Sequence, residues 1–130
     1  MARKSRELAE FLAAFANELT SGDAESAVRR LSPQDDLLVV GTDQAEWLED
    51  AEAIRDAFRK EAGSVRAQLE HTTAYEEDGF GWIAARGTLT LPDGDAVPIR
   101  WTVILRRESN TWKIIHSHMS VPADGHPPGT

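Results

Sequence analysis

Three histidines of this chain have the chemistry for proton transfer. His116 and His118 lie two residues apart in the run 112–120, and His71 lies in an earlier stretch of alternating residues. Because histidine titrates near neutral pH without assistance, His118 could act as an acid or base with His71 or Tyr75 beside it. Two histidines at this spacing also suit a metal ion, but no carboxylate stands at a suitable distance, so no metal site is predicted.

Two arginines interrupt apolar stretches of the sequence. Arg86 follows Ala84 and Ala85, and Arg100 stands near Thr102. A charged side chain is rarely buried in such surroundings unless it has a partner or contacts a ligand. If both arginines point inward, they give a cavity a fixed positive charge suited to an acidic ligand. Alternatively, they pair with acidic residues of a helix or lie at a surface between two copies of the chain.

Helices and strands must position these residues, and the hydrophobic pattern predicts where they are. Apolar residues at three- and four-residue spacing predict a first helix, Asp23 is a suitable N-cap for a second, and Gly63 is a suitable end for a third. From Ser64 onward the period becomes two, which predicts four long strands. The predicted helices are 5–20, 24–31 and 50–62, and the predicted strands are 36–42, 64–75, 80–91, 97–107 and 112–120.

Helices followed by long strands are typical of an α+β fold, with the helices on one face of a curved antiparallel sheet. In the third long strand Arg100 and Thr102 alternate with Trp101, and in the fourth both histidines share the parity of Trp112. Neither face is cleanly polar, as a solvated face should be. We therefore expect the face of Arg100 and Thr102 to line a cavity. We expect the other face to meet a second copy of the chain in a homodimer.

Composition limits the class of protein. A length of 130 residues suits a single domain, placed at 1–121, with a flexible C-terminal tail at 122–130. The net charge of −8 is spread along the chain, which disfavours binding to nucleic acid. The chain has no cysteine, no apolar run long enough to span a membrane, and an amphipathic helix pattern where a signal peptide would stand. We therefore expect a cytoplasmic protein without membrane contact.

Five segments form a more specific pattern: 41–43, 46–47, 51–58, 100–107 and 112–120. The most specific is the last, which reads Trp-Lys-Ile-Ile-His, one residue, His, one residue, Ser. Together these segments resemble the SnoaL-like branch of the nuclear-transport-factor-2-like superfamily. The resemblance extends over residues 5–121, which is nearly the whole predicted domain.

The resemblance implies a cone, in which a strongly bent sheet wraps around a long helix and a cavity opens at the wide end, usually in a dimer. The superfamily includes ketosteroid isomerase, polyketide cyclases and the association domain of calcium/calmodulin-dependent kinase, so the fold does not determine the function. Arg86 matches a cavity arginine of the kinase domain, whereas Thr102 stands at a second such position. Asp43 falls near the region of the isomerase base, and Trp47 falls near the mouth of the cone. Isomerase chemistry itself is not supported, because Tyr75 is the only tyrosine and no acid partner for an oxyanion hole can be identified.

The sequence thus predicts a protein that binds a small organic ligand, suited to an acidic group, in a cone-shaped cavity and without a cofactor. Two alternatives stay open: a cofactor-free isomerase, cyclase or dehydratase, and a dimerisation module without cavity chemistry. The predicted ligand-binding residues are Arg86, Arg100, Thr102, Tyr75 and Trp47, and the candidate catalytic residues of the enzyme are His118, His71 and Asp43.

Overall fold

The computed structural model of the chain describes residues 1–123, so that only Pro122 and Ala123 of the predicted tail fall within it. The elements follow the predicted order, with two additional short strands. The helices are α1 (Arg6–Ser21), α2 (Ala24–Arg29) and α3 (Ala51–Glu61). The strands are β1 (Arg3–Lys4), β2 (Leu38–Val40), β3 (Trp47–Leu48), β4 (Arg66–Glu77), β5 (Phe80–Thr90), β6 (Ala96–Glu108) and β7 (Thr111–Ser120).

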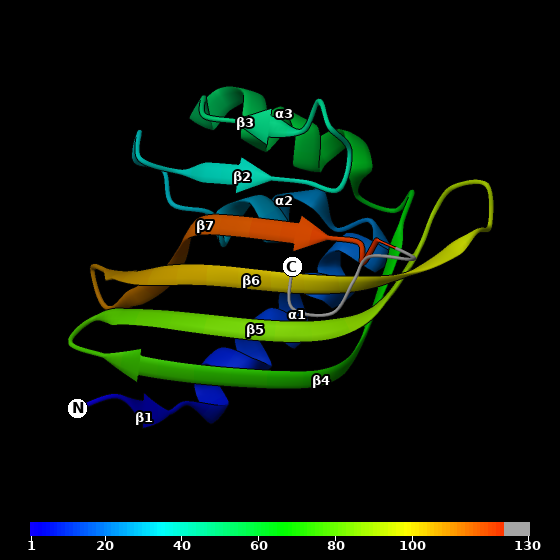
Figure 1. The fold of residues 1–130 in the computed structure, drawn as a ribbon. Helices are drawn as coiled ribbons and strands as arrows, with labels where there is room; N and C mark the ends of the chain where they lie inside the picture. Colours follow the sequence, from blue (N-terminus) through cyan, green and yellow to red (C-terminus); the bar gives the residue numbers. More distant parts are fainter. Residues whose placement is uncertain (124–130) are drawn as a thin grey trace.

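Helix α1 forms the centre of the core. The Ser5 hydroxyl caps its first turn by accepting a hydrogen bond from the Leu8 amide, and Gly22 ends it in the left-handed conformation, with φ of 86°. The helix lies behind the strands in Figure 1, so it covers one face of the sheet, here called the inner face, and leaves the outer face open. The predicted apolar stripe is buried against the inner face and comprises Leu8, Leu12, Phe15, Ala16 and Leu19.

The four long strands form an antiparallel meander with short strands at both edges (Figure 1). The order across the sheet is β1-β4-β5-β6-β7-β2-β3, and β2 pairs with β7 in parallel. The predicted α+β fold, a curved sheet wrapped around a long helix, is confirmed. The sequence did not indicate β1 or β3, nor that β2 would extend the sheet beyond β7. No helix within residues 1–123 is long and apolar enough to cross a lipid bilayer.

Two one-residue bulges interrupt the pairing of the long strands. In β4 Glu70 has no partner in β5, and in β7 Ile115 has no partner in β6. A bulge bends its strand, and because side chains alternate, it also exchanges the two faces beyond that point. The bulges therefore contribute to the curvature of the sheet, and the second one decides where the C-terminal half of β7 points.

The structure corrects the predicted faces of the sheet. Trp101 and Trp112 are 2% and 5% exposed and belong to the core on the inner face, rather than to a partner surface. Arg100 and Thr102 alternate with Trp101 and are exposed on the outer face. The physical reason is that an indole ring has far more apolar area to bury than a threonine or a guanidinium group.

Candidate functional site

A small pocket lies on the inner face, where α3 and the β2–β3 hairpin approach the sheet. Its volume is about 70 Å³, and its wall is mostly apolar. At about 10–15 Å³ for each water-sized group, this volume holds roughly five such groups. The lining residues from the helices and the hairpin are Leu19, Val39, Val40, Gly41, Thr42, Glu46, Leu48, Ala57, Phe58 and Glu61, and those that follow α3 in the chain are Val65, Ala67, Leu89, Trp101, Ser117 and Met119.

A wider, open hollow of about 690 Å³ adjoins the pocket and is here called the vestibule. The pocket and the vestibule share six lining residues: Thr42, Glu46, Ala57, Glu61, Val65 and Leu89. These six residues therefore mark the mouth through which the pocket is reached. Two of them are glutamates, and they are the only acidic residues that line the pocket within the described part of the chain.

Glu61 is the last residue of α3 and is partly buried at the pocket mouth. Burial raises the pKa of its carboxyl group above the ordinary value for glutamate, and the negative charge of Glu46 raises it further. A carboxylate at a helix C-terminus also faces the negative end of the helix dipole. Glu61 is therefore a carboxyl group that holds its proton more firmly than an exposed glutamate does.

Glu46 is held by the turn between β2 and β3. Its Oε1 accepts a hydrogen bond from the Asp43 amide at 2.9 Å, and the Asp43 carbonyl accepts one from the Glu46 amide at the same distance. A side chain at Gly41 would meet Glu46, because a Cβ atom built there lies 2.8 Å from both Cβ and Oε1 of Glu46. The absence of a side chain at Gly41 therefore gives the Glu46 carboxylate its place at the mouth.

Ser117 provides a polar group in the wall of the pocket. It is 4% exposed, and its hydroxyl oxygen accepts a hydrogen bond from the indole Nε1 of Trp101 at 2.9 Å. Within residues 1–123 the hydroxyl donates no hydrogen bond of its own. The Ser117 proton is therefore free to be donated to a molecule in the pocket.

Replacing Glu61 by glutamine is expected to stabilise the protein at neutral pH. Because the folded-state pKa is raised, the stability that Glu61 contributes is fully present below its unfolded-state pKa and is lost as the pH rises through the folded-state value. The neutral amide avoids that loss, so the gain of Glu61→Gln should shrink as the pH falls through the glutamate range. Urea unfolding midpoints of both proteins at several pH values measure the difference. A gain that does not depend on pH would contradict this assignment.

The structure places the predicted ligand-binding residues outside the pocket. Arg86, Arg100 and Thr102 are exposed on the outer face, where Arg86 lies directly opposite Arg100 on the neighbouring strand. Tyr75 lies on the same face, with its ring 6.1 Å from that of Trp82, and Trp47 is 68% exposed. None of these five residues lines the pocket described above, because their strands turn the alternate residues inward, and their part in ligand binding stays a prediction.

The candidate catalytic residues lie apart from one another. His116 and His118 are on the outer face, because Ile115 is an extra residue that exchanges the faces of β7. His71 is on β4, three strands away, which is roughly 14 Å at ordinary strand spacing. Asp43 lines the vestibule but not the pocket. Among the described residues, no group of three or more His, Cys, Asp or Glu side chains has the arrangement to hold a metal ion.

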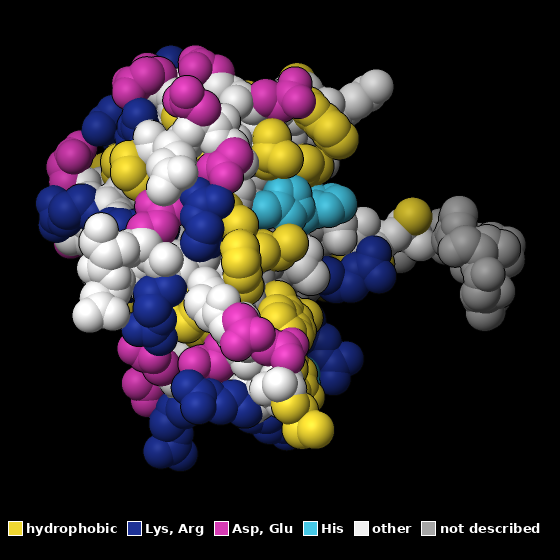
Figure 2. Space-filling view, turned by 90° about the vertical axis from the view of Figure 1, so that its left-hand side faces the viewer, with side chains coloured by type: hydrophobic (Ala, Val, Ile, Leu, Met, Phe, Trp, Pro, Cys, Tyr) yellow, Lys and Arg dark blue, Asp and Glu magenta, His cyan; other side chains and the backbone are white. Residues whose placement is uncertain are grey.

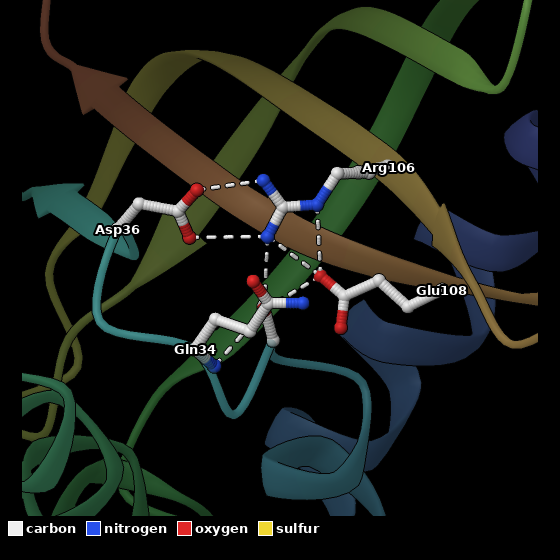
Figure 3. Close-up of polar contacts among 5 residues, drawn as sticks. Gln34, Asp36, Arg106 and Glu108 are labelled. Carbon is white, nitrogen blue, oxygen red and sulfur yellow. Dashed lines mark hydrogen bonds and ion pairs between the residues drawn. The ribbon is translucent and has the colours of Figure 1, made fainter.

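A second polar cluster surrounds Arg106 (Figure 3). Its guanidinium group donates hydrogen bonds of 2.6 and 3.1 Å to Asp36 and of 2.8 and 3.0 Å to Glu108, and these bonds raise its pKa. Glu108 also accepts a hydrogen bond from the buried hydroxyl of Ser32. Since each charged group of this cluster has a partner of opposite charge within the chain, we assign it a structural role: it fastens the segment between α2 and β2 to β6.

The sequence reasoning missed Glu46, Glu61 and Ser117. One signal for Glu61 was available, because it follows Ile54 and Phe58 at helical spacing and so falls within the apolar stripe of its helix. Glu46 had no such signal, since its place depends on the turn that folds it back toward Gly41.

Comparison with solved structures shows the same fold in several proteins. An NTF2-like protein of unknown function from Pseudomonas putida KT2440 is 18% identical with a TM-score of 0.79, covering 92% of this chain and 87% of that one. A calcium/calmodulin-dependent protein kinase II association domain, so described provisionally, from Xanthomonas campestris is 22% identical with a TM-score of 0.75, covering 92% and 88%. A proposed dehydratase of the NTF2-like family from Streptomyces avermitilis is 14% identical with a TM-score of 0.78, covering 90% and 94%.

None of the curated proteins matches this chain. The family profile described as a SnoaL-like domain, in contrast, matches residues 8–124, which is nearly the full length of the chain. The profile match and the shared fold agree with the architecture described above, in which a curved sheet wraps around α1. The chain therefore belongs to the SnoaL-like domain family.

Proposed function

We propose that this protein binds a small organic molecule in the pocket, with Glu61 as the group that shares a proton or hydrogen bond with it. The observation that supports this proposal is a carboxyl group of raised pKa at the mouth of an otherwise apolar pocket. The acidic ligand suggested by the sequence is not retained, because the arginines that would bind it lie on the outer face. A cytoplasmic location is part of the same proposal.

Binding can be tested with isotope-labelled protein and a set of apolar fragments of about five non-hydrogen atoms. We expect the backbone amide signals of Val40, Ser117 and Met119 to shift as fragments enter the pocket. Ala57→Leu should abolish these shifts, because Ala57 lines both the pocket and its mouth. Ala53→Leu, on an exposed position of the same helix, is the matched control. If no fragment moves the pocket signals, or if both variants behave alike, the proposal is wrong.

A second candidate is acid–base catalysis by a cofactor-free isomerase, cyclase or dehydratase. The raised pKa of Glu61 favours it, since a carboxyl group that keeps its proton closer to neutral pH is a more effective general acid. The proposed dehydratase of the same fold from Streptomyces avermitilis points in the same direction. Once a substrate is found, Glu61→Gln should lower kcat and remove one step of the pH–rate profile. An unchanged pH–rate profile would contradict a catalytic role for Glu61 and leave ligand binding as the proposed function.

We also propose that a second copy of the chain covers the outer face. Tyr75, Trp82, Ile104, His116 and Leu38 lie directly opposite one another on five adjacent strands, and this set is here called the outer row. Three of its members are large apolar side chains that are 40–43% exposed. In Figure 2 the front of Figure 1 lies on the right, and hydrophobic side chains and histidines gather along that edge. An apolar row of this length is typical of an interface between proteins.

Replacing Ile104 by aspartate is expected to weaken the dimer. A buried charge at the middle of the outer row would cost about 2 kcal/mol or more, which is roughly a thirtyfold increase in the dissociation constant. Light scattering at micromolar concentration measures the effect. Ser21→Asp, at the exposed end of α1, is the control and should leave the mass unchanged. A wild-type protein with the mass of a monomer would exclude the proposed dimer.

A further inference from the structure

We infer that the pocket selects a ligand with a single positive charge, such as a primary amine on a short apolar chain. This inference rests on the proposed function and names the chemical class that the same pocket would take. In this arrangement the ammonium group lies between Glu46 and Glu61 and the hydrocarbon chain points toward Trp101.

The mouth of the pocket is acidic. Glu46 and Glu61 both line it, and they are near enough for the charge of one to affect the other. Among the described residues, no lysine or arginine lines the pocket, and Lys60 is the one basic side chain of the vestibule. Glu46 accepts a hydrogen bond from the neutral backbone amide of Asp43. Within residues 1–123, neither Glu46 nor Glu61 forms an ion pair. The pair therefore presents negative charge that the described chain does not neutralise.

Other partly buried acidic residues of this chain have a cationic partner. Glu18 is paired with Arg30 by two hydrogen bonds of 2.7 Å, and Glu108 is paired with Arg106. Glu76 is likewise paired with Arg3, and Glu77 with the N-terminal amino group. This fold thus supplies a cationic partner to partly buried glutamates elsewhere, as the cost of burying a charge requires. The pair at the mouth lacks such a partner and opens toward a cavity, so a ligand can provide the missing positive charge.

The remaining wall of the pocket limits the rest of the ligand. Beyond the mouth the lining is apolar, except for the buried Ser117 hydroxyl, whose proton has no acceptor within the described residues. With space for roughly five water-sized groups, the pocket accepts an unbranched chain of about four carbon atoms behind a charged head. The Ser117 hydroxyl could additionally donate to an acceptor atom in such a chain. An anion of the same size would place its charge against Glu46 and Glu61 and should be excluded.

The test uses three probes of equal length that differ in charge: n-butylamine, n-butanol and butyrate. Their dissociation constants are measured at neutral pH from the amide signals of Val40, Ser117 and Met119, which restricts the readout to the pocket. We expect butylamine to bind about tenfold more tightly than butanol, and butyrate not to bind. Butylamine should also bind more tightly as the pH rises, because its partner Glu61 must be ionised. Glu46→Gln and Glu61→Gln should each remove the preference for the amine, and Glu49→Gln, an exposed residue outside the pocket, should keep it.

The outcomes separate this inference from the proposed function. If none of the three probes moves the pocket signals, the proposed binding function and the inference fail together. If butanol binds as tightly as butylamine, or if the preference survives in both glutamine variants, the pocket binds small molecules but the inference is overturned. The inference is supported if Glu46→Gln and Glu61→Gln lose the preference for butylamine while Glu49→Gln keeps it. Unfolding midpoints must show that the Glu46 and Glu61 variants are folded.

Discussion

Replacing Trp101 by alanine is expected to lower the free energy of unfolding by about 3–5 kcal/mol. The side chain is 2% exposed, and its ring centroid lies 5.8 Å from that of Phe15 in α1. The change leaves a cavity between helix and sheet and also removes the indole donor from the Ser117 hydroxyl. Urea unfolding of the variant and the wild type measures the loss.

The matched control for Trp101 is Trp47→Ala. Trp47 is 68% exposed on the outer face, so its removal should change the free energy of unfolding by at most about 0.5 kcal/mol in the monomer. The contrast tests the corrected faces of the sheet directly. Comparable losses for the two tryptophans would mean that the assignment of inner and outer residues is wrong.

Replacing Gly87 by alanine is expected to destabilise the protein by about 2 kcal/mol or more. A Cβ atom at this position would clash with the carbonyl oxygen of Gln68 and lie 2.9 Å from Cα of Leu69, both of which are backbone atoms. The backbone of β4 approaches so closely because its bulge at Glu70 begins beside this contact. Since a backbone cannot rotate away as a side chain can, the two strands must separate.

Chemical denaturation of Gly87→Ala gives the size of this effect, and Ala84→Ser on the same strand is the control. Ala84 is exposed on the outer face, so its replacement should stay within about 0.5 kcal/mol. A small loss for Gly87→Ala would show that β4 can move away from β5 at the bulge at little cost. In that case the bulge would be a flexible part of the sheet rather than a fixed bend.

The sequence predicted the helices and long strands well because their signals are local. Asp23 caps α2 by accepting a hydrogen bond from the Ser26 amide, and the alternation after Ser64 corresponds to β4. Which face of a strand points inward is not a local property when both faces mix apolar and polar residues. The sequence separated Trp101 from Arg100 correctly, but only the packing of α1 decides that the tryptophan is the buried one.

The pocket could not be predicted for a related reason. Glu46 and Glu61 line the same mouth because α3 folds back over the β2–β3 hairpin, and that hairpin is placed by the parallel pairing of β2 with β7. Parallel pairing of distant segments has no turn signal between them. The site therefore depends on contacts between parts of the chain that are far apart in sequence, whereas the predicted histidines and arginines were chosen from their immediate neighbours.

The extra residue Ile115 has a consequence for how members of this fold can diverge. If β7 paired with β6 without this bulge while keeping Ile115, that residue would lie opposite Ile104, and His116 and His118 would come to the inner face, where Ser117 and Met119 now meet the pocket. A shift of one residue in the register of β7 would thus exchange a serine and a methionine for two ionisable rings, without any substitution. The register of this strand is therefore a route by which one scaffold acquires a different chemistry, and homologues are best compared at this point by strand register rather than by residue identity.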